Sequence, residues 1–254
     1  MSEPLRPRAT LRTAVVWDVL RDALAEQVRA TGRDVLDVLD TGGGTGNFAV
    51  PVARLGHRVT VVDPSPDALF ALERRAAEAG VAELVHGVQG DAHGLLEVVE
   101  RHSHDVVLCH GVLEYVDDPA EAVGNVVGAL RPTGTLSLLV ANRNGVVLAR
   151  AIAGHFAEAQ RVLTDDLGRW GQGDPVPRRF TEPGLTALVT GAGLRVAAVH
   201  GVRVFADLVP GALVDTEPGA LQALLRLESA AAQEPSFRSC ATQLHLLADR
   251  SQEA

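Results

Sequence analysis

The chain has 254 residues, 46% of them hydrophobic, which is enough for one sizeable α/β domain with an appended element. Its formal net charge of -9 argues against a broad basic face of the kind that binds nucleic acid non-specifically. Two cysteines are too few for a disulfide framework, and no apolar run approaches the length of a membrane span. We therefore expect a cytoplasmic protein without a membrane partner.

The most informative stretch of the chain follows an amphipathic helix that we expect over about residues 11–30. The apolar run 35–39 predicts a buried parallel strand, which ends at Asp40 just before the glycines of residues 42–46. A helix follows, and residues 59–62 predict the next strand, with Asp63 at its carboxyl end. Glycines allow a ligand to approach the backbone closely, and a carboxylate at the tip of the second strand can accept both hydroxyls of a ribose.

The spacing of this loop distinguishes two classes of nucleotide cofactor. Gly42, Gly44 and Gly46 give GxGxG, and Asn47 occupies the place where a dinucleotide fingerprint needs its third glycine. Asp40 would repel the phosphates of a dinucleotide, whereas it suits the ammonium or sulfonium charge of S-adenosylmethionine. An ordinary glycine-rich turn needs neither four glycines nor an acid at the next strand tip. The stretch therefore predicts an S-adenosylmethionine site that includes Asp40, Gly42, Gly43, Gly44 and Asp63.

The remaining segments continue the alternation of strands and helices. Strand tips would converge on one crevice, as in open α/β sheets, with Gly90, Asp91 and His110 at the tips of the third and fourth strands. The expected strands are 84–89, 104–110, 135–140, 194–200 and 241–248, and the expected helices are 65–79, one turning in from 111–116, 122–134, 144–162, 185–190 and 219–232. We expect a single domain over residues 1–254, with a core at about 34–140, an inserted helical roof at about 141–182 and the rest of the sheet at about 183–248.

Several motifs resemble those of class I methyltransferases, namely LDTGGGTG, VVD, QGDA, LCHGVLEYVDDP and LRPTGTLSLL. The flanking motifs LRTAVVWDVL, ANRNGVVLARAIAGHF, GVRVFADL and LLRLESAAAQEP resemble one family of them, the tRNA 5-carboxymethoxyuridine methyltransferases, CmoM. The resemblance runs from about Arg12 to Ala248. It implies a Rossmann-like class I fold with a seven-stranded, mostly parallel sheet and an antiparallel terminal hairpin. The cofactor contacts that it implies are Arg12, Gly43, Gly44, Asp63, Gly90, Asp91 and His110.

The resemblance also implies a reaction, the methylation of the carboxylate of wobble 5-carboxymethoxyuridine with release of S-adenosylhomocysteine. Such a carboxylate is already ionised, so we expect positioning and no obligatory catalytic base. Arg178 and Arg203 are our candidates for binding it, although Arg203 suits a structural ion pair equally well. For His110 a cofactor contact competes with a role as general base. The histidines at 102 and 104 with Asp105 lack a partner pair, so we expect no metal site.

Two other functions stay open at this stage. Where CmoM proteins can carry a lysine-rich stretch, this chain has the acidic segment 164–174, and it contains no lysine at all. A small-molecule O- or N-methyltransferase of biosynthetic metabolism would explain this charge. A non-catalytic cofactor-binding partner protein is the second alternative, but the intact glycine loop and Asp63 argue against it. The oligomeric state is not predicted.

Overall fold

The computed structural model describes residues 7–250 as two compact units. One unit comprises the chain up to Val19 together with Val140–Leu185 and Val199–His245, and the other comprises Leu20–Leu139, Thr186–Ala198 and the chain from Leu246. None of the helices within residues 7–250 is both long and apolar enough to cross a membrane. Five elements pass from one unit into the other, namely α1 (Pro7–Thr31), β5 (Leu130–Ala141), α8 (Glu182–Gly191), β6 (Leu194–Val202) and β7 (Gln243–Arg250).

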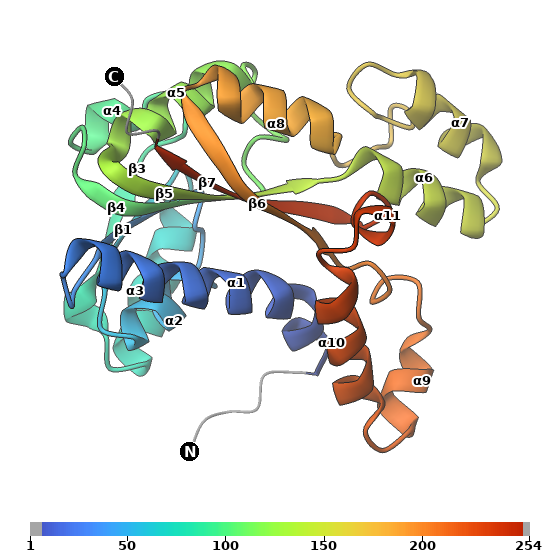
Figure 1. Cartoon of the computed structure of the whole chain (residues 1–254), viewed down its shortest axis with the longest axis horizontal. Coiled ribbons are helices and arrows are strands. Elements are labelled where there is room, and N and C mark those ends of the chain that lie inside the picture. The colour runs from blue at the N-terminus through green and yellow to red at the C-terminus, as the bar shows by residue number, and fades with distance from the viewer. Residues whose placement is uncertain (1–6, 251–254) are drawn as a thin grey trace. The chain divides into compact units, whose positions relative to one another are not determined.

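The strands form one seven-stranded sheet in the order β3-β2-β1-β4-β5-β7-β6 (Figure 1). Strands β1 to β5 pair in parallel, and the sheet ends in an antiparallel hairpin, as predicted. The first four strands are β1 (Asp37–Thr41), β2 (Arg58–Asp63), β3 (Val85–Gln89) and β4 (His104–His110). Because the order reverses between β1 and β4, the loops that follow these strands meet where open α/β sheets bind ligands.

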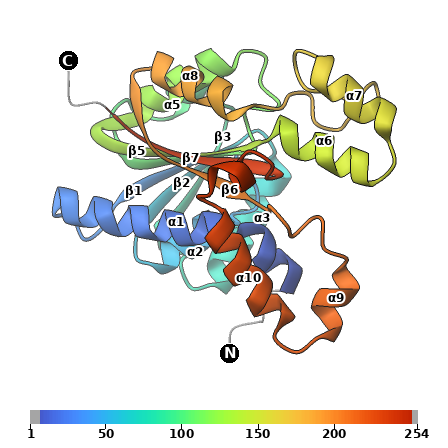
Figure 2. The same cartoon turned by 45° about the vertical axis from the view of Figure 1, so that its right-hand side comes forward.

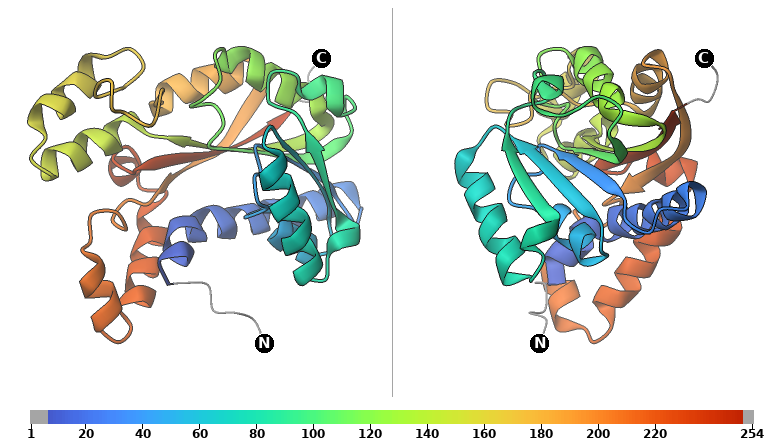
Figure 3. Two further views of the ribbon diagram at one scale, coloured as in Figure 1. Left: turned by 180° about the vertical axis from the view of Figure 1, so that it is seen from behind. Right: turned by 90° about the vertical axis from the view of Figure 1, so that its left-hand side faces the viewer.

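The helices of the larger unit cover both faces of its strands. Helices α2 (Ala49–Arg54) and α3 (Pro66–Glu78) lie on one face, and α5 (Pro119–Ala129) lies on the other (Figure 3). Helix α3 begins as its sequence predicts, because Ser65 caps it by accepting the Ala68 N–H and Pro66 lies in its first turn. Helix α5 is capped in the same way by Asp118, with Pro119 in its first turn, three residues before the predicted start at residue 122. The short helices here are a 3-10 turn (Ala82–Leu84) and α4 (Leu95–Val98).

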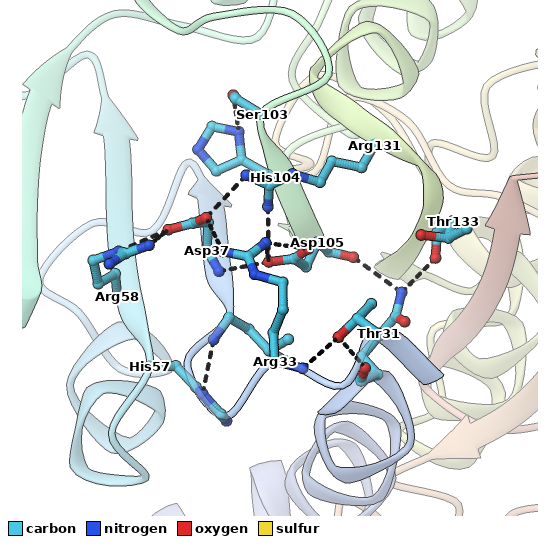
Figure 4. Close-up of polar contacts among 12 residues, drawn as sticks. Thr31, Arg33, Asp37, His57, Arg58, Ser103, His104, Asp105, Arg131 and Thr133 are labelled. Atoms are coloured by element: carbon cyan, nitrogen blue, oxygen red, sulfur yellow. Dashed lines mark hydrogen bonds and ion pairs between the residues drawn. The ribbon is translucent and has the colours of Figure 1, made fainter. Parts of the chain in front are cut away.

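A charged network joins the amino ends of β1 and β4 (Figure 4). Arg33 and Arg131 both pair with Asp105, which is 2% exposed, and the same two arginines and Arg58 pair with Asp37. Asp105 also accepts the backbone N–H of Asp37 at 2.8 Å. Although burial alone would raise it, hydrogen bonds from the three arginines lower the pKa of Asp37 to about 2. The network therefore fastens the start of β1 to β4 and β5.

The smaller unit contains the inserted segment as two helices, which corrects the single helix expected over residues 144–162. Helix α6 (Arg143–Ile152) and helix α7 (Phe156–Thr164) lie side by side (Figure 2). The break falls at Gly154, whose φ of 80° is a left-handed conformation that ends a helix. The unit also holds α9 (Gly211–Thr216), α10 (Ala220–Ala231) and α11 (Pro235–Arg238); α9 and α11 were not expected.

Two boundaries near β4 and β5 also differ from expectation. No helix starts in residues 111–118, which form turns, because the chain turns at Gly111 (φ 68°) and the capping side chain comes only at Asp118. Strand β5 begins at Leu130, five residues earlier than predicted, and its pairing with β4 is irregular between His104 and Val106. Residues 131–134, which were expected to end a helix, thus form the irregular start of a strand.

Candidate functional site

The loop after β1 is built from glycines that other residues could not replace. Gly42, Gly44 and Gly46 have φ angles of 68°, 55° and 80°, in the left-handed region that favours glycine. A Cβ atom on Gly43 would lie 2.5 Å from the Oδ2 atom of Asp40 and 2.9 Å from a methyl group of Val61. Only glycine therefore fits between the carboxyl group of Asp40 and the backbone of the loop.

Asp40 is the most unusual titratable group of this loop. Its side chain is buried, and its Oδ2 atom has no hydrogen-bond partner among residues 7–250. Burial, reinforced by the negative charge of Asp63, raises the pKa of Asp40 to about 7. A buried carboxyl group in this situation is stabilised in its ionised form by a cationic ligand.

Asp63 at the tip of β2 is oriented by the backbone. Its Oδ2 atom accepts the N–H of Gly44 at 2.8 Å, and its Oδ1 atom accepts the N–H of Ser65 at 2.9 Å. Each carboxylate oxygen can accept a further hydrogen bond. The loop and the carboxylate are thereby held as one unit, with capacity left for two hydroxyl donors.

The tip of β3 continues the site. The N–H of Gly90 donates to the carbonyl oxygen of Asp63 at 3.2 Å, so the two strand ends are tied together. The Oδ1 atom of Asp91 accepts the N–H groups of His93 and Gly94 at 3.0 and 2.9 Å. Asp91 is exposed, so its Oδ2 atom is accessible to a donor such as an amine.

His110 is the last residue of β4. Its Nε2 atom shares a hydrogen bond of 2.9 Å with Ser137, and its ring meets the ring of Phe48 edge to face at 4.6 Å. Burial lowers the pKa of His110 to about 3, so the ring is neutral near pH 7 and a very weak base. Its environment therefore favours the cofactor contact over general-base catalysis.

These groups fit the expected cofactor by their chemistry. The orphaned carboxyl oxygen of Asp40 suits a cation, and the pre-oriented Asp63 suits vicinal hydroxyls, which together match the methionine and ribose parts of S-adenosylmethionine. Phosphates would meet the charge of Asp40, which disfavours a dinucleotide. Within residues 7–250 no group of three or more histidine, cysteine or acidic residues is placed to hold a metal ion.

The other predicted residues lie in the smaller unit. Arg12 is exposed on α1, and Arg178 is half-buried in the loop before α8. Arg203 follows β6 and pairs with Asp207, its Nε donating to Oδ2 at 2.8 Å. The structural ion pair considered for Arg203 is therefore present, while the ligand contacts of all three arginines stay predictions.

Sequence reasoning missed several residues around these sites. Ser137 and Phe48 contact His110 across strands or along the loop, and Glu114 is 4% exposed although it was read as the start of a helix. In the smaller unit Trp170 lies against the guanidinium groups of Arg150 and Arg179, 3.6 and 4.5 Å from the ring centroid. These contacts join residues distant in sequence, so no local pattern could reveal them.

Comparison with known proteins agrees with this geometry. A family profile described as a methyltransferase domain matches residues 39–136. The tRNA 5-carboxymethoxyuridine methyltransferase of Escherichia coli K12 is 30% identical over 246 residues, covering 96% of this chain and 90% of that protein. A ubiquinone biosynthesis O-methyltransferase of Methylobacterium nodulans is 35% identical over 66% of this chain and 64% of its own length.

A solved structure supports the fold. A SAM-dependent methyltransferase from Methanosarcina mazei superposes with a TM-score of 0.59 at 17% identity, covering 87% of this chain and 95% of that one. The strand order and the glycine loop followed by two acidic strand tips define a class I methyltransferase that depends on S-adenosylmethionine. Within that class, the chain belongs to the family of the tRNA 5-carboxymethoxyuridine methyltransferases.

Proposed function

We propose that the protein methylates the carboxylate of 5-carboxymethoxyuridine at the wobble position of tRNA. The observation that carries this proposal is the extent of the similarity. The Escherichia coli tRNA 5-carboxymethoxyuridine methyltransferase matches over 96% of this chain, whereas the Methylobacterium nodulans ubiquinone enzyme matches over 66%. The similarity therefore extends beyond the methyltransferase domain at residues 39–136 into the segments before and after it.

The proposed reaction needs alignment more than acid–base chemistry. The cofactor supplies a methyl group on a positively charged sulfur. In our proposal Asp40 and Asp63 fix its charged and ribose parts, Gly43 and Gly44 line it, and His110 stays neutral. An ionised carboxylate is already a nucleophile, and well-aligned reactants gain up to about 7–11 kcal/mol from orientation. No side chain is required as a base.

Three arginines complete the proposal. Arg12 would bind the carboxylate of the cofactor's methionine part, as the family's motif around Leu11 and Trp17 suggests. Arg203 and Arg178 would bind the carboxylate of the modified uridine, for which the planar guanidinium is well suited. Because Val15, Val16 and Leu20 of the same helix are buried, Arg12→Ala is a cleaner test of the first role than removing the helix.

The decisive experiment offers the purified protein radiolabelled S-adenosylmethionine and two substrates. One is tRNA from cells that lack this methylation, and the other is a small-molecule extract. We expect label in the tRNA as a base-labile ester, with a rate that falls steeply as salt rises, since tRNA binding releases counterions. Unlabelled tRNA at low salt, with cofactor binding intact, would refute the proposal.

A small-molecule methyltransferase is the second candidate. The net charge of -9 and the absence of lysine favour it, because a tRNA partner must then be held by local arginines against the mean field of the protein. In that case the label would appear in the extract, and the rate would respond only weakly to salt.

A further inference from the structure

Arg203 is held in a conformation that its residue type disfavours. It follows the last residue of β6 with a φ of 59°, one of two non-glycine residues in the described part of the chain with a left-handed backbone. A non-glycine residue keeps such a backbone conformation only where surrounding contacts enforce it, and residues of this kind are frequent at functional sites. The contacts on either side of Arg203 show what fixes it.

The carboxylate of Glu228 fixes the chain just after Arg203. It is 1% exposed and accepts the N–H groups of three consecutive residues, Val204, Phe205 and Ala206, at 2.9, 2.8 and 2.6 Å. Successive N–H groups converge in this way when a left-handed residue starts the turn, which makes a concave anion site in the backbone. Glu228 on α10 occupies that anion site.

The carbonyl group of Arg203 is fixed as well. It accepts the N–H of Thr242 at 3.3 Å and the hydroxyl of the same residue at 3.1 Å. The backbone of Arg203 is thus clamped between the start of β7 and the buried carboxylate of Glu228. The direction in which the side chain of Arg203 leaves the backbone, along its Cα–Cβ bond, is therefore set by the fold.

The guanidinium of Arg203 is occupied by an internal carboxylate. Its Nε and Nη2 atoms both donate to the Oδ2 atom of Asp207, the former at 2.8 Å. These two donors form the edge that a guanidinium offers to a carboxylate ligand. The side chains of Arg203 and Asp207 are 22% and 27% exposed, so an external carboxylate can reach the pair.

We propose that the carboxylate of Asp207 occupies, on the guanidinium of Arg203, the position that the substrate carboxylate takes when it binds. Glu228 is then a positioning residue, which fixes the backbone conformation from which Arg203 binds the substrate carboxylate. This inference rests on the proposed function, because it assumes a carboxylate-bearing substrate. Substrate binding then exchanges one carboxylate for another, so the guanidinium is never left without a partner. Asp207 in this role discriminates against substrates that lack the carboxylate, since these cannot replace it.

The first test replaces the internal carboxylate. Asp207→Asn should bind the free nucleoside 5-carboxymethoxyuridine about two- to fivefold more tightly than the unmodified chain, the range that a partly exposed ion pair supplies. The methyl ester of the nucleoside should show no such gain. If Asp207 only supports Arg203, the same substitution will weaken binding of the acid, and this opposite sign overturns the proposal.

The second test addresses Glu228. In Glu228→Gln the preference for the acid over the methyl ester should fall to near one, while the dissociation constant for S-adenosylmethionine is unchanged. The Nε–H NMR signal of Arg203, assigned by its loss in Arg203→Lys, should move from its original position. Glu234→Gln is the matched control, because Glu234 is exposed nearby and makes no capping hydrogen bond. A retained preference together with an unshifted signal overturns the role of Glu228.

These binding tests separate the inference from the proposed function. If the unmodified protein fails to methylate tRNA while Asp207→Asn still gains affinity for the acid, the tRNA substrate is wrong and the exchange of carboxylates stands. If neither protein binds the nucleoside acid at millimolar concentration, the inference fails whatever the tRNA assay gives.

Discussion

Strand β1 carries an aspartate near each end, and the two have opposite environments. Asp37 at the amino end meets three arginines, and its pKa is lowered to about 2. Asp40 near the carboxyl end is buried with an orphaned oxygen, and its pKa is raised to about 7. The two residues are separated by only two positions in a five-residue strand. The charge of Asp37 is balanced by arginines, whereas within residues 7–250 the Oδ2 atom of Asp40 has no hydrogen-bond partner.

The opposite pKa shifts indicate different roles for the two aspartates: Asp37 contributes to stability, whereas Asp40 is suited to binding a ligand. Asp37, with its lowered pKa, contributes stability that is present above about pH 4 and lost as the pH falls through about 2. Asp40, with its pKa raised to about 7, opposes folding at every pH above the ordinary pKa of an aspartate, about 4. This cost is complete above pH 7, shrinks as the pH falls from 7 and is gone only near pH 4. A carboxylate that costs stability at neutral pH is expected where a ligand supplies the missing charge.

The largest effect should come from breaking the amino-end network. Asp105→Asn removes the buried charge that Arg33 and Arg131 share, which should lower the free energy of unfolding by about 3 kcal/mol. Urea unfolding measures it, and the exposed Glu73→Gln on α3 is the control. A loss below about 1 kcal/mol would mean that this network is as weak as a surface ion pair.

The second-largest effect should come from disturbing the cofactor site at the carboxyl end of β1. In Gly43→Ala the new Cβ would meet the carboxyl group of Asp40 at 2.5 Å, so the loop must shift, and we expect cofactor affinity to fall more than about a hundredfold. Calorimetric titration with S-adenosylmethionine gives the dissociation constant. Gly124→Ala in α5, where nothing lies within 4 Å of the new Cβ, should bind normally. Unchanged affinity in Gly43→Ala would place the cofactor elsewhere.

A smaller loss should follow removal of the carboxylate at the tip of β2. A hydrogen bond to a charged group contributes about 1.5–3 kcal/mol, so Asp63→Ala should weaken cofactor binding roughly ten- to a hundredfold. Because the N–H groups of Gly44 and Ser65 also lose their acceptor, circular dichroism should accompany the titration. A folded variant with the original dissociation constant removes Asp63 from the site.

The smallest expected effect is a pH dependence from Asp40. A cationic cofactor lowers the pKa of Asp40, so binding should release a proton, and affinity should rise about eightfold between pH 6 and 7.5. Titration in two buffers of different ionisation enthalpy counts the released protons. Asp40→Asn should bind with a flat profile over this range, and an equally steep profile in that variant would assign the proton to another group.

The sequence predicts the parallel strands and the glycine loop after β1 well, because both depend on local pattern. The apolar run before Asp40, the glycines after it and Asp63 after the next strand all lie within one short segment. The cap at Ser65 and the stop at Gly80 are likewise local signals. For this reason the positions of β1, β2 and α3 agree with the structure to within a residue or two.

The sequence fails where the decisive contacts are distant. Arg33 and Asp105 are 72 residues apart, and Glu228 meets the backbone near Arg203 from more than 20 residues away. The early start of β5 at Leu130 depends on pairing with His104, which overrides the proline and glycine that follow. The break between α6 and α7 could have been predicted from Gly154, but the helical spacing of apolar residues on both sides of it indicated one continuous helix.

The two cysteines differ in a way that is useful for labelling. Cys109 is 1% exposed in β4, and burial raises the pKa of its thiol, so it resists alkylation. Cys240 is exposed, and it lies only two residues before Thr242, the residue that holds the carbonyl group of Arg203. A thiol-reactive fluorophore should therefore attach at this single position without any substitution. Its emission would report in real time on events at the arginine that we assign to substrate binding.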